Sequence, residues 1–177
     1  MMTWIWAWLM LPGLLFLSGC PDDGGEGGEG GNIVSSVAYV ANSGSNNVSA
    51  YTITAGTGVL TPVAGSPFVA GTTPSGVTVS PNGAFLYVSN QGSNNVSAYT
   101  ITAGTGVLTP VAGSPFVAGT TPSGVTISPD GQFLYVANSG GNVSGYRITA
   151  GTGALDSLGA AFAAGTTPVS IATPGRP

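Results

Sequence analysis

Short stretches in which apolar and polar residues alternate recur along the chain beyond residue 32, and turn residues separate them. In one such unit, residues 77–80 alternate, a Pro-Asn-Gly turn follows, and residues 85–88 form a second apolar stretch. Because Asn-Gly between two such stretches is typical of a β-hairpin, both are predicted to be strands. Residues 96–102 and 107–111 add two β-branched stretches, so the unit contains four predicted strands and no stretch with helical period.

The unit is repeated almost letter for letter. Residues 39–86 and 87–134 are each 48 residues long and differ at only five positions. The differing pairs are Ala41/Ser89, Ser43/Gln91, Val79/Ile127, Asn82/Asp130 and Ala84/Gln132. A third, looser copy occupies residues 135–177, in which Tyr146 takes the place of Tyr99. A repeat of this length indicates one supersecondary unit that is stacked several times.

Four short strands per repeat predict an all-β fold. Each strand is apolar on at least one face, so the unit is a small twisted sheet that must pack against similar sheets, as the blades of a β-propeller do. Pro110 lacks an N–H and fits the outer edge of a blade. Six recurring tyrosines are predicted to form the core between blades, namely Tyr39, Tyr51, Tyr87, Tyr99, Tyr135 and Tyr146.

Specific motifs within the repeats carry a family resemblance. They are FLYVSN (85–90), FLYVAN (133–138), the turns SPNG and SPDG, and NVSAYTI followed by GSPF. Over about residues 33–173 the chain resembles the lactonase-like, YVTN-type propeller family that includes 6-phosphogluconolactonase-like proteins. The resemblance implies a ring of usually about seven blades. It also implies action on a sugar lactone by polar and charged groups, including histidine, glutamate and arginine, around the top of a complete ring.

The phase of the repeat suggests how such a ring closes. The chain enters at the second strand of a blade, residues 33–40, and leaves after a first strand, residues 167–172, which aligns with residues 121–126. Propellers of this kind close when the last strand completes the first blade. The chain holds about three blades, fewer than the roughly four of the smallest rings. It is therefore an open arc, a truncated product, or part of a ring shared between chains. Two copies would give six blades in a symmetric dimer, and self-association is our expectation.

The first part of the chain predicts where the protein is located in the cell. Residues 4–17 are apolar but shorter than the roughly 20 residues that span a bilayer, which is typical of a signal-peptide core. The sequence Leu17-Ser18-Gly19-Cys20 resembles a bacterial lipobox, in which cleavage precedes a cysteine that carries lipid. Residues 1–19 are thus predicted to be a lipoprotein signal peptide, although no Lys or Arg precedes its apolar core.

Cys20 and the following residues to 32 are predicted to form a lipidated tether. The tether is rich in glycine and carries four acids, which account for the whole net charge of −4. It places the protein at the bacterial cell envelope, anchored through lipid on Cys20 in the periplasm or at the cell surface. The predicted propeller then occupies residues 33–177.

Charge excludes one class of partner. Beyond the tether the only charged side chains are Asp130, Arg147, Asp156 and Arg176, and the chain has no lysine. Because phosphate binding needs clustered Lys and Arg, nucleic acid is not an expected partner. The partners that remain are the membrane through Cys20, a second copy of the chain, or a protein or glycan.

The residues offer little for catalysis. The chain has no histidine and a single cysteine, so no imidazole base, thiolate site or metal site is predicted, and no cofactor is expected. Asp130 stands in a turn where the previous copy has Asn82, which favours a turn former. No catalytic residue of the lactonase-like enzymes transfers to a position here. The candidate ligand contacts are Arg147, Asn94 and Asn95, each weighed against an ordinary packing or turn role.

Two functions from different classes fit these observations. The first is a membrane-tethered, non-catalytic propeller module that binds a partner or builds an assembly. The alternative is a lactonase-like, 6-phosphogluconolactonase-type hydrolase that is complete only as an oligomer. A truncated gene product without a function of its own is the third possibility.

Overall fold

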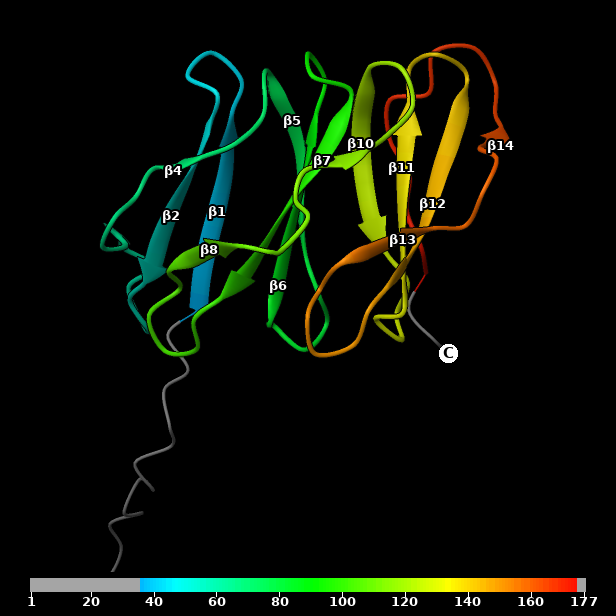
Figure 1. Ribbon diagram of the computed structural model, residues 1–177. Helices are drawn as coiled ribbons and strands as arrows, with labels where there is room; N and C mark the ends of the chain where they lie inside the picture. Colours follow the sequence, from blue (N-terminus) through cyan, green and yellow to red (C-terminus); the bar gives the residue numbers. More distant parts are fainter. Residues whose placement is uncertain (1–35, 175–177) are drawn as a thin grey trace, which may run out of the picture. The chain divides into compact units, whose positions relative to one another are not determined.

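The computed structural model describes residues 36–174, which form three antiparallel sheets that follow one another along the chain (Figure 1). No helix occurs in this described range. The first sheet contains β1 (Ser36–Asn42), β2 (Asn47–Ile53), β3 (Leu60–Pro62) and β4 (Phe68–Val69). The second contains β5 (Pro74–Val79), β6 (Phe85–Asn90), β7 (Asn95–Ile101), β8 (Leu108–Pro110) and β9 (Phe116–Val117). The third contains β10 (Pro122–Ile127), β11 (Phe133–Asn138), β12 (Asn142–Ile148), β13 (Leu155–Ser157) and β14 (Phe162–Ala163).

Each sheet has the order of a propeller blade, which confirms the predicted fold class. In the second blade β5 pairs with β6 and β6 with β7, and the outermost position belongs to β8 and β9. The third blade repeats this order, and the first lacks only the inner strand. Pro110 lies on the outermost strand opposite Tyr99, as predicted from its missing N–H.

The fourth strand of the repeat differs from the prediction, because it is split in two. β8 pairs with one half of β7 and β9 with the other half. Between them the chain turns away from the ladder, with Gly113 at a φ of 84° and the Ser114 N–H bonded to the Val111 carbonyl. The Ser114 hydroxyl then accepts the Ala98 N–H at 2.9 Å, so a side chain replaces the missing backbone partner.

The hairpin turn between inner and second strands forms as its sequence predicts. Asn82 Oδ1 accepts the Ser80 hydroxyl and the Ala84 N–H, at 2.7 and 3.1 Å. In the next copy Asp130 Oδ1 accepts the Ser128 hydroxyl and the Gln132 N–H in the same arrangement. The Asp130 carboxylate therefore accepts the same two hydrogen bonds as the Asn82 amide oxygen. Asp130 has the turn role that the repeat comparison favoured.

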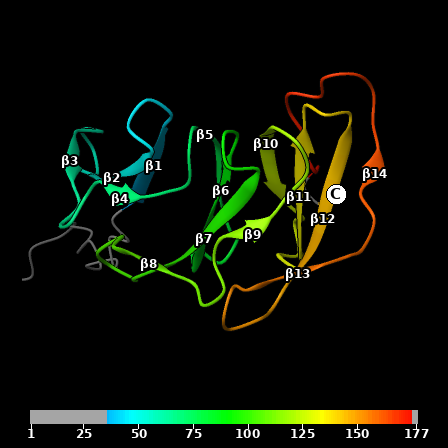
Figure 2. The ribbon, with the colours of Figure 1, turned by 45° about the horizontal axis from the view of Figure 1, so that its top comes forward.

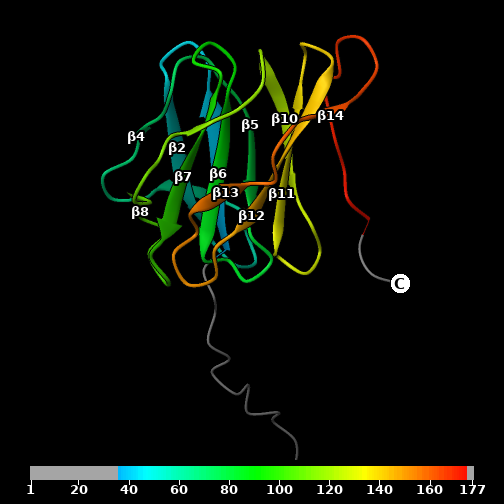
Figure 3. The ribbon, with the colours of Figure 1, turned by 45° about the vertical axis from the view of Figure 1, so that its right-hand side comes forward.

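The three blades pack face to face, with apolar side chains between them (Figures 2 and 3). The inner strands β5 and β10 approach closely at Gly76. A Cβ atom placed on Gly76 would lie only 2.6 Å from the Ser123 carbonyl oxygen. Only glycine permits this approach. The described blades form an open arc and no closed ring.

The end of the described chain lies where a fourth inner strand would lie. Residues 167–172, predicted to be a first strand, form no ladder with β1 or any other described strand. They lie against β10 instead, since the Ser123 hydroxyl donates to the Pro168 carbonyl at 3.0 Å. The Thr173 hydroxyl likewise donates to the Ile127 carbonyl at 2.6 Å.

The predicted signal peptide, the lipobox residues Leu17, Ser18 and Gly19, Cys20 and the tether lie outside the described residues. Among residues 36–174 there is no helix of the length and hydropathy needed to cross a membrane.

Candidate ligand-binding rim

One end of the blades gathers the loops that would surround the mouth of a ring. The turns at residues 43–46, 91–94 and 139–141 lie there, beside the connections that lead into each inner strand (Figure 1). We call these turns and the connections at residues 70–73, 118–121 and 164–167 the upper rim. The opposite end, which carries the turns at residues 80–84 and 128–132, is the lower end.

Asn94 lies on the upper rim but is engaged within the protein. Its Oδ1 accepts the Thr121 N–H of the next blade at 2.7 Å, and Asn46 accepts the Thr73 N–H at 2.8 Å in the same way. These asparagines have φ values of 53° and 55°, a left-handed conformation that asparagine tolerates. The predicted ligand contact at Asn94 is thus also a clamp between neighbouring blades.

Thr73, Thr121 and Thr167 adopt positive φ values of 51°, 56° and 53°. A β-branched residue in this region is strained, at a cost on the order of 1–3 kcal/mol. The strain recurs wherever a connection enters an inner strand, so it belongs to the architecture of the rim. The hydrogen bonds from the Thr73 and Thr121 N–H groups to Asn46 and Asn94 hold the backbone there against this strain.

Asn95 belongs to a network just below the rim. Its Oδ1 accepts the Asn90 side-chain N–H at 2.8 Å and the Ser93 hydroxyl at 3.1 Å. Asn90 is fully buried and also donates to Ser97 at 2.9 Å. In the third blade Asn138 occupies the place of Asn90, and its Oδ1 is the one buried side-chain acceptor in the described range without a partner.

Serine hydroxyls join the inner strands near the rim. Ser75 donates to the carbonyls of Pro122 and Ser123, at 3.0 and 3.1 Å. Ser89 donates to the same Ser123 carbonyl at 2.8 Å. The described rim is therefore built from neutral hydroxyl and amide groups, which can orient a polyhydroxyl ligand through hydrogen bonds.

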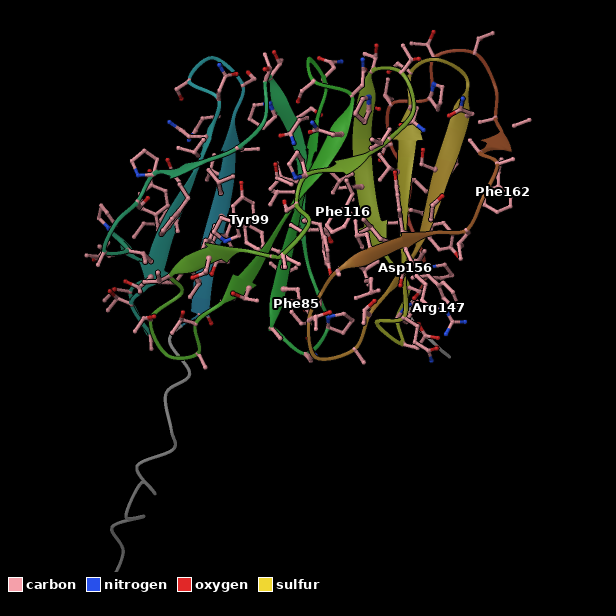
Figure 4. The ribbon with its side chains drawn as sticks, viewed as in Figure 1. Phe85, Tyr99, Phe116, Arg147, Asp156 and Phe162 are labelled. Carbon is pink, nitrogen blue, oxygen red and sulfur yellow. The ribbon has the colours of Figure 1, made fainter. Side chains whose placement is uncertain are left out.

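The charged side chains of the described residues lie away from the rim. Arg147 pairs with Phe133 at one end of the β11–β12 ladder, and Asn138 pairs with Asn142 at the other, rim end. Arg147 is exposed, with its guanidinium carbon 5.5 Å from the centre of the Phe133 ring (Figure 4). Asp156 lies opposite Arg147 on β13 and accepts the Thr149 hydroxyl at 3.0 Å. The structure therefore does not bring Arg147 together with Asn94 and Asn95.

Two clefts open at the lower end, at equivalent places between consecutive blades. One, of about 250 Å³, is lined by the 80–82 and 130–132 turns together with Phe85. The other, of about 300 Å³, is lined by Val37, Tyr39 and residues 101–104. Their repetition makes them a result of blade stacking. Among the described residues, no three His, Cys, Asp or Glu side chains gather as a metal site would require.

Three of the six recurring tyrosines are buried between blades as predicted, namely Tyr87, Tyr99 and Tyr146, whereas the other three are half-buried. Four of the six also hydrogen-bond to a neighbouring blade. Tyr39 and Tyr87 donate to the carbonyls of Gly106 and Gly153, both at 2.9 Å. Burial raises the pKa of Tyr39 to about 12, and it raises the pKa of Tyr87 further. Both hydroxyls therefore stay protonated at neutral pH and act as donors. The glycine acceptors lie more than sixty residues away along the chain, so strand patterns gave no signal for them.

Comparisons with known proteins identify the family of this fold. A family model described as lactonase, 7-bladed β-propeller, matches residues 32–172. No curated protein sequence matches the chain.

Solved structures give the same fold. A periplasmic gluconolactonase of Pseudomonas aeruginosa is 21% identical with a TM-score of 0.65, over 76% of this chain and 39% of the other. A candidate 6-phosphogluconolactonase of Bacteroides fragilis is 24% identical with a TM-score of 0.69, over 78% of this chain and 39% of the other. A protein of unknown function from Desulfotomaculum acetoxidans is 26% identical with a TM-score of 0.62, over 70% of this chain and 37% of the other. This chain therefore spans well under half the length of these structures.

Proposed function

The chain belongs to the family of lactonases with a seven-bladed β-propeller, and we propose that it acts as a lactonase-type hydrolase whose ring is completed by oligomerisation. The described blades supply the arc of rim that holds the sugar lactone. The observation that carries the proposal is the upper rim itself, which brings hydroxyl and amide groups from successive blades to one end of the inner strands. Gluconolactonases among the structural neighbours supply the substrate class.

Hydrolysis of a lactone consumes one water molecule. Water first loses a proton to the solvent. The resulting hydroxide oxygen bonds to the carbonyl carbon, the ring C–O bond breaks, and the freed ring oxygen takes the proton of the new carboxyl group, which leaves a hydroxy acid anion. The described rim has no side chain that accepts a proton near neutral pH, so hydroxide from solvent is the nucleophile in this proposal. The blades contribute by orienting the sugar at the rim.

This mechanism has a distinctive pH dependence. Without a protein base, the protein-dependent rate rises with hydroxide concentration over pH 6–9 and shows no bell-shaped profile. The test is acid release from gluconolactone and its 6-phosphate by the full chain, with the spontaneous rate subtracted. A rate no higher than the spontaneous one ends the hydrolase proposal.

Arg147→Ala locates the site within that assay. Because Arg147 lies at the lower end, hydrolysis at the upper rim is unchanged in this variant. Loss of activity moves the site to the lower end, where the Arg147 guanidinium would bind the substrate's anionic group. Its unfolding midpoint serves as the control for folding.

A second candidate is a non-catalytic propeller module that binds a partner or builds an assembly. It is favoured by the position of the charged side chains at the lower end and by the rim groups that already bond within the protein. Glycan or peptide binding without lactone hydrolysis would establish it.

In either case we propose that lipid on Cys20 tethers the protein to the cell envelope. Metabolic labelling with a fatty acid tests the tether, because Cys20→Ser abolishes incorporation. Label retained in that variant contradicts it.

A further inference from the structure

Each junction between blades joins two different faces. The forward face of a blade packs on the backward face of the next. At the second junction the forward face consists of Phe85, Tyr87, Val96, Ala98 and Val111. The backward face that meets it contains Leu134, Val136, Tyr146 and Leu155. The matching residues form the first junction, where Val48 meets Leu86, Val88, Tyr99 and Leu108.

The backward face of the first blade is uncovered within the described structure. Leu60 is 51% exposed, whereas its repeat equivalents Leu108 and Leu155 are 5% and 6% exposed. Val40 is 44% exposed, whereas its equivalent Val88 is fully buried. These apolar side chains are therefore those of a junction that lacks its partner.

The forward face of the third blade is uncovered as well. Leu158 is 42% exposed, whereas its equivalents Val63 and Val111 are each 5% exposed. Phe162, at 53% exposure, lies on the open side of this blade (Figure 4). The two uncovered faces are of opposite kinds, as are the two faces that meet at each junction within the chain.

The tyrosine hydrogen bonds show the same gap. Tyr39 and Tyr87 donate forward to a glycine of the next blade, whereas their equivalent Tyr135 has no hydrogen-bond partner among the described residues. Tyr99 and Tyr146 donate backward, to the Val69 carbonyl and to the Val117 carbonyl.

Tyr51 is the equivalent of Tyr99 in the first blade, and it also has no partner in the described range. One hydroxyl at each end of the arc thus awaits an acceptor.

The backbone is incomplete at the same two ends. β1 is an edge strand without the inner strand that β5 and β10 provide in the other blades. Residues 168–173 occupy an inner-strand place beside β10 but lack a second strand. By the register of β10 with β11, Ile171 would pair with Val40 of another blade.

We infer that a second copy of the chain binds head to tail at both ends, so that two three-bladed arcs close one ring of six blades. The forward face of each copy covers the backward face of the other, and residues 168–173 of each complete the other's first blade. Tyr135 then donates to the Gly58 carbonyl of the second copy, and Tyr51 to its Ala163 carbonyl. This ring has one blade fewer than the seven of the family's description, and six blades fall within the range of roughly four to eight found in propellers.

The contact chemistry favours a second copy over an unrelated partner. At the two junctions within the chain, the forward face of one repeat packs on the backward face of the next. A blade that covers the forward face of the third blade therefore needs a backward face like those of the second and third blades. The first blade carries Val40, Tyr51 and Leu60 at the positions of Val88, Tyr99 and Leu108 on the backward face of the second blade. This inference rests on the proposed function, in which oligomerisation completes the ring. Its test measures mass and not hydrolysis, so the two proposals can fail separately.

The test uses the full chain in a mild nonionic detergent, with its mass measured by sedimentation equilibrium. Wild type is expected at twice the mass that the same preparation shows as a single chain in denaturant. Leu60→Asp places a charge on the backward face of the first blade, and Leu158→Asp places one on the forward face of the third blade. Each variant alone is expected to weaken the dimer by at least about 100-fold, because a carboxylate is buried at both junctions.

Mixing the two variants separates head-to-tail pairing from any other association. The mixture retains one intact junction, between the forward face of Leu60→Asp and the backward face of Leu158→Asp, so a two-chain species is expected to return. Association of like faces would instead leave one of the two variants dimeric on its own, because each variant keeps one face unchanged. A monomeric wild type, or a mixture that stays monomeric, overturns the inference.

Two further variants guard against trivial results. Val117→Asp adds the same charge at a position that is 82% exposed and away from both end faces, so it should remain dimeric. Tyr135→Phe is the mildest change and should weaken the dimer about tenfold, since the closed ring contains that hydrogen bond twice. Circular dichroism shows whether each variant is folded. A dimer without lactone hydrolysis supports this inference and refutes only the hydrolase proposal, whereas hydrolysis by a monomer does the reverse.

Discussion

Removal of the Tyr87 hydroxyl tests how the blades are held together. Tyr87 is fully buried, and its hydroxyl donates at 2.9 Å to the carbonyl of Gly153 in the next blade. In Tyr87→Phe the ring remains but the carbonyl loses its donor in a place that water does not reach. An unsatisfied buried acceptor costs about 1–3 kcal/mol, and that is the expected loss in free energy of unfolding.

The assay is urea unfolding followed by far-ultraviolet circular dichroism. With a slope of about 2 kcal/mol per molar urea, the midpoint should fall by about 1 M. Both the variant and its reference carry Leu60→Asp, so that self-association does not contribute to the measured stability.

Tyr39→Phe is the matched control. It removes the same bond, to Gly106 at 2.9 Å, from a hydroxyl whose residue is only half-buried. Because water can replace the lost donor there, its cost should stay below about 1 kcal/mol. Equal losses in the two variants would refute the reasoning from burial, and no loss in Tyr87→Phe would refute the role of the bond.

Three other changes follow from the structure. Gly76→Ala should lower the free energy of unfolding by about 1–3 kcal/mol in urea titrations, because its Cβ would lie 2.6 Å from a backbone oxygen of the neighbouring inner strand. Gly44→Ala, with open space around its Cβ, should change it by less than about 0.5 kcal/mol, and equal effects would contradict the argument. Asp130→Asn should leave the urea midpoint unchanged, because Asn82 makes the same two turn bonds in the preceding copy; a large loss would show that the charge matters. Burial raises the pKa of Tyr39 to about 12, so its stabilisation is complete below the unfolded value of about 10 and is lost as pH rises from there towards 12; urea midpoints that stay flat over this range would contradict it.

Much of the fold follows from the repeat because its signals are local. The alternation at residues 77–80 and the Asn-Gly turn specify a hairpin within about ten residues of chain, and Pro110 specifies an outer edge. The split of the fourth strand was not predicted, since it depends on the Ser114 hydroxyl replacing a backbone acceptor for Ala98 across the sheet.

The candidate site was less predictable, because its contacts join different blades. Asn94 was recognised as a polar loop residue, yet its partner Thr121 lies 27 residues further on, at the entry to the next blade. Arg147 was a candidate ligand contact, and only the register of β11 with β12 shows that it lies at the lower end, over Phe133. The near-identical repeats predict the strands of each blade. They do not show which blade faces are uncovered, and this follows only from the exposed fractions of equivalent residues such as Leu60 and Leu108.

The central claim of this account is that the three blades complete a ring with a second copy of the chain. The most direct measurement is the mass of the full chain in solution, by sedimentation equilibrium. The account predicts twice the single-chain mass for wild type and for the Val117→Asp control, with one single-chain mass for Leu60→Asp. A single chain mass for wild type would contradict it.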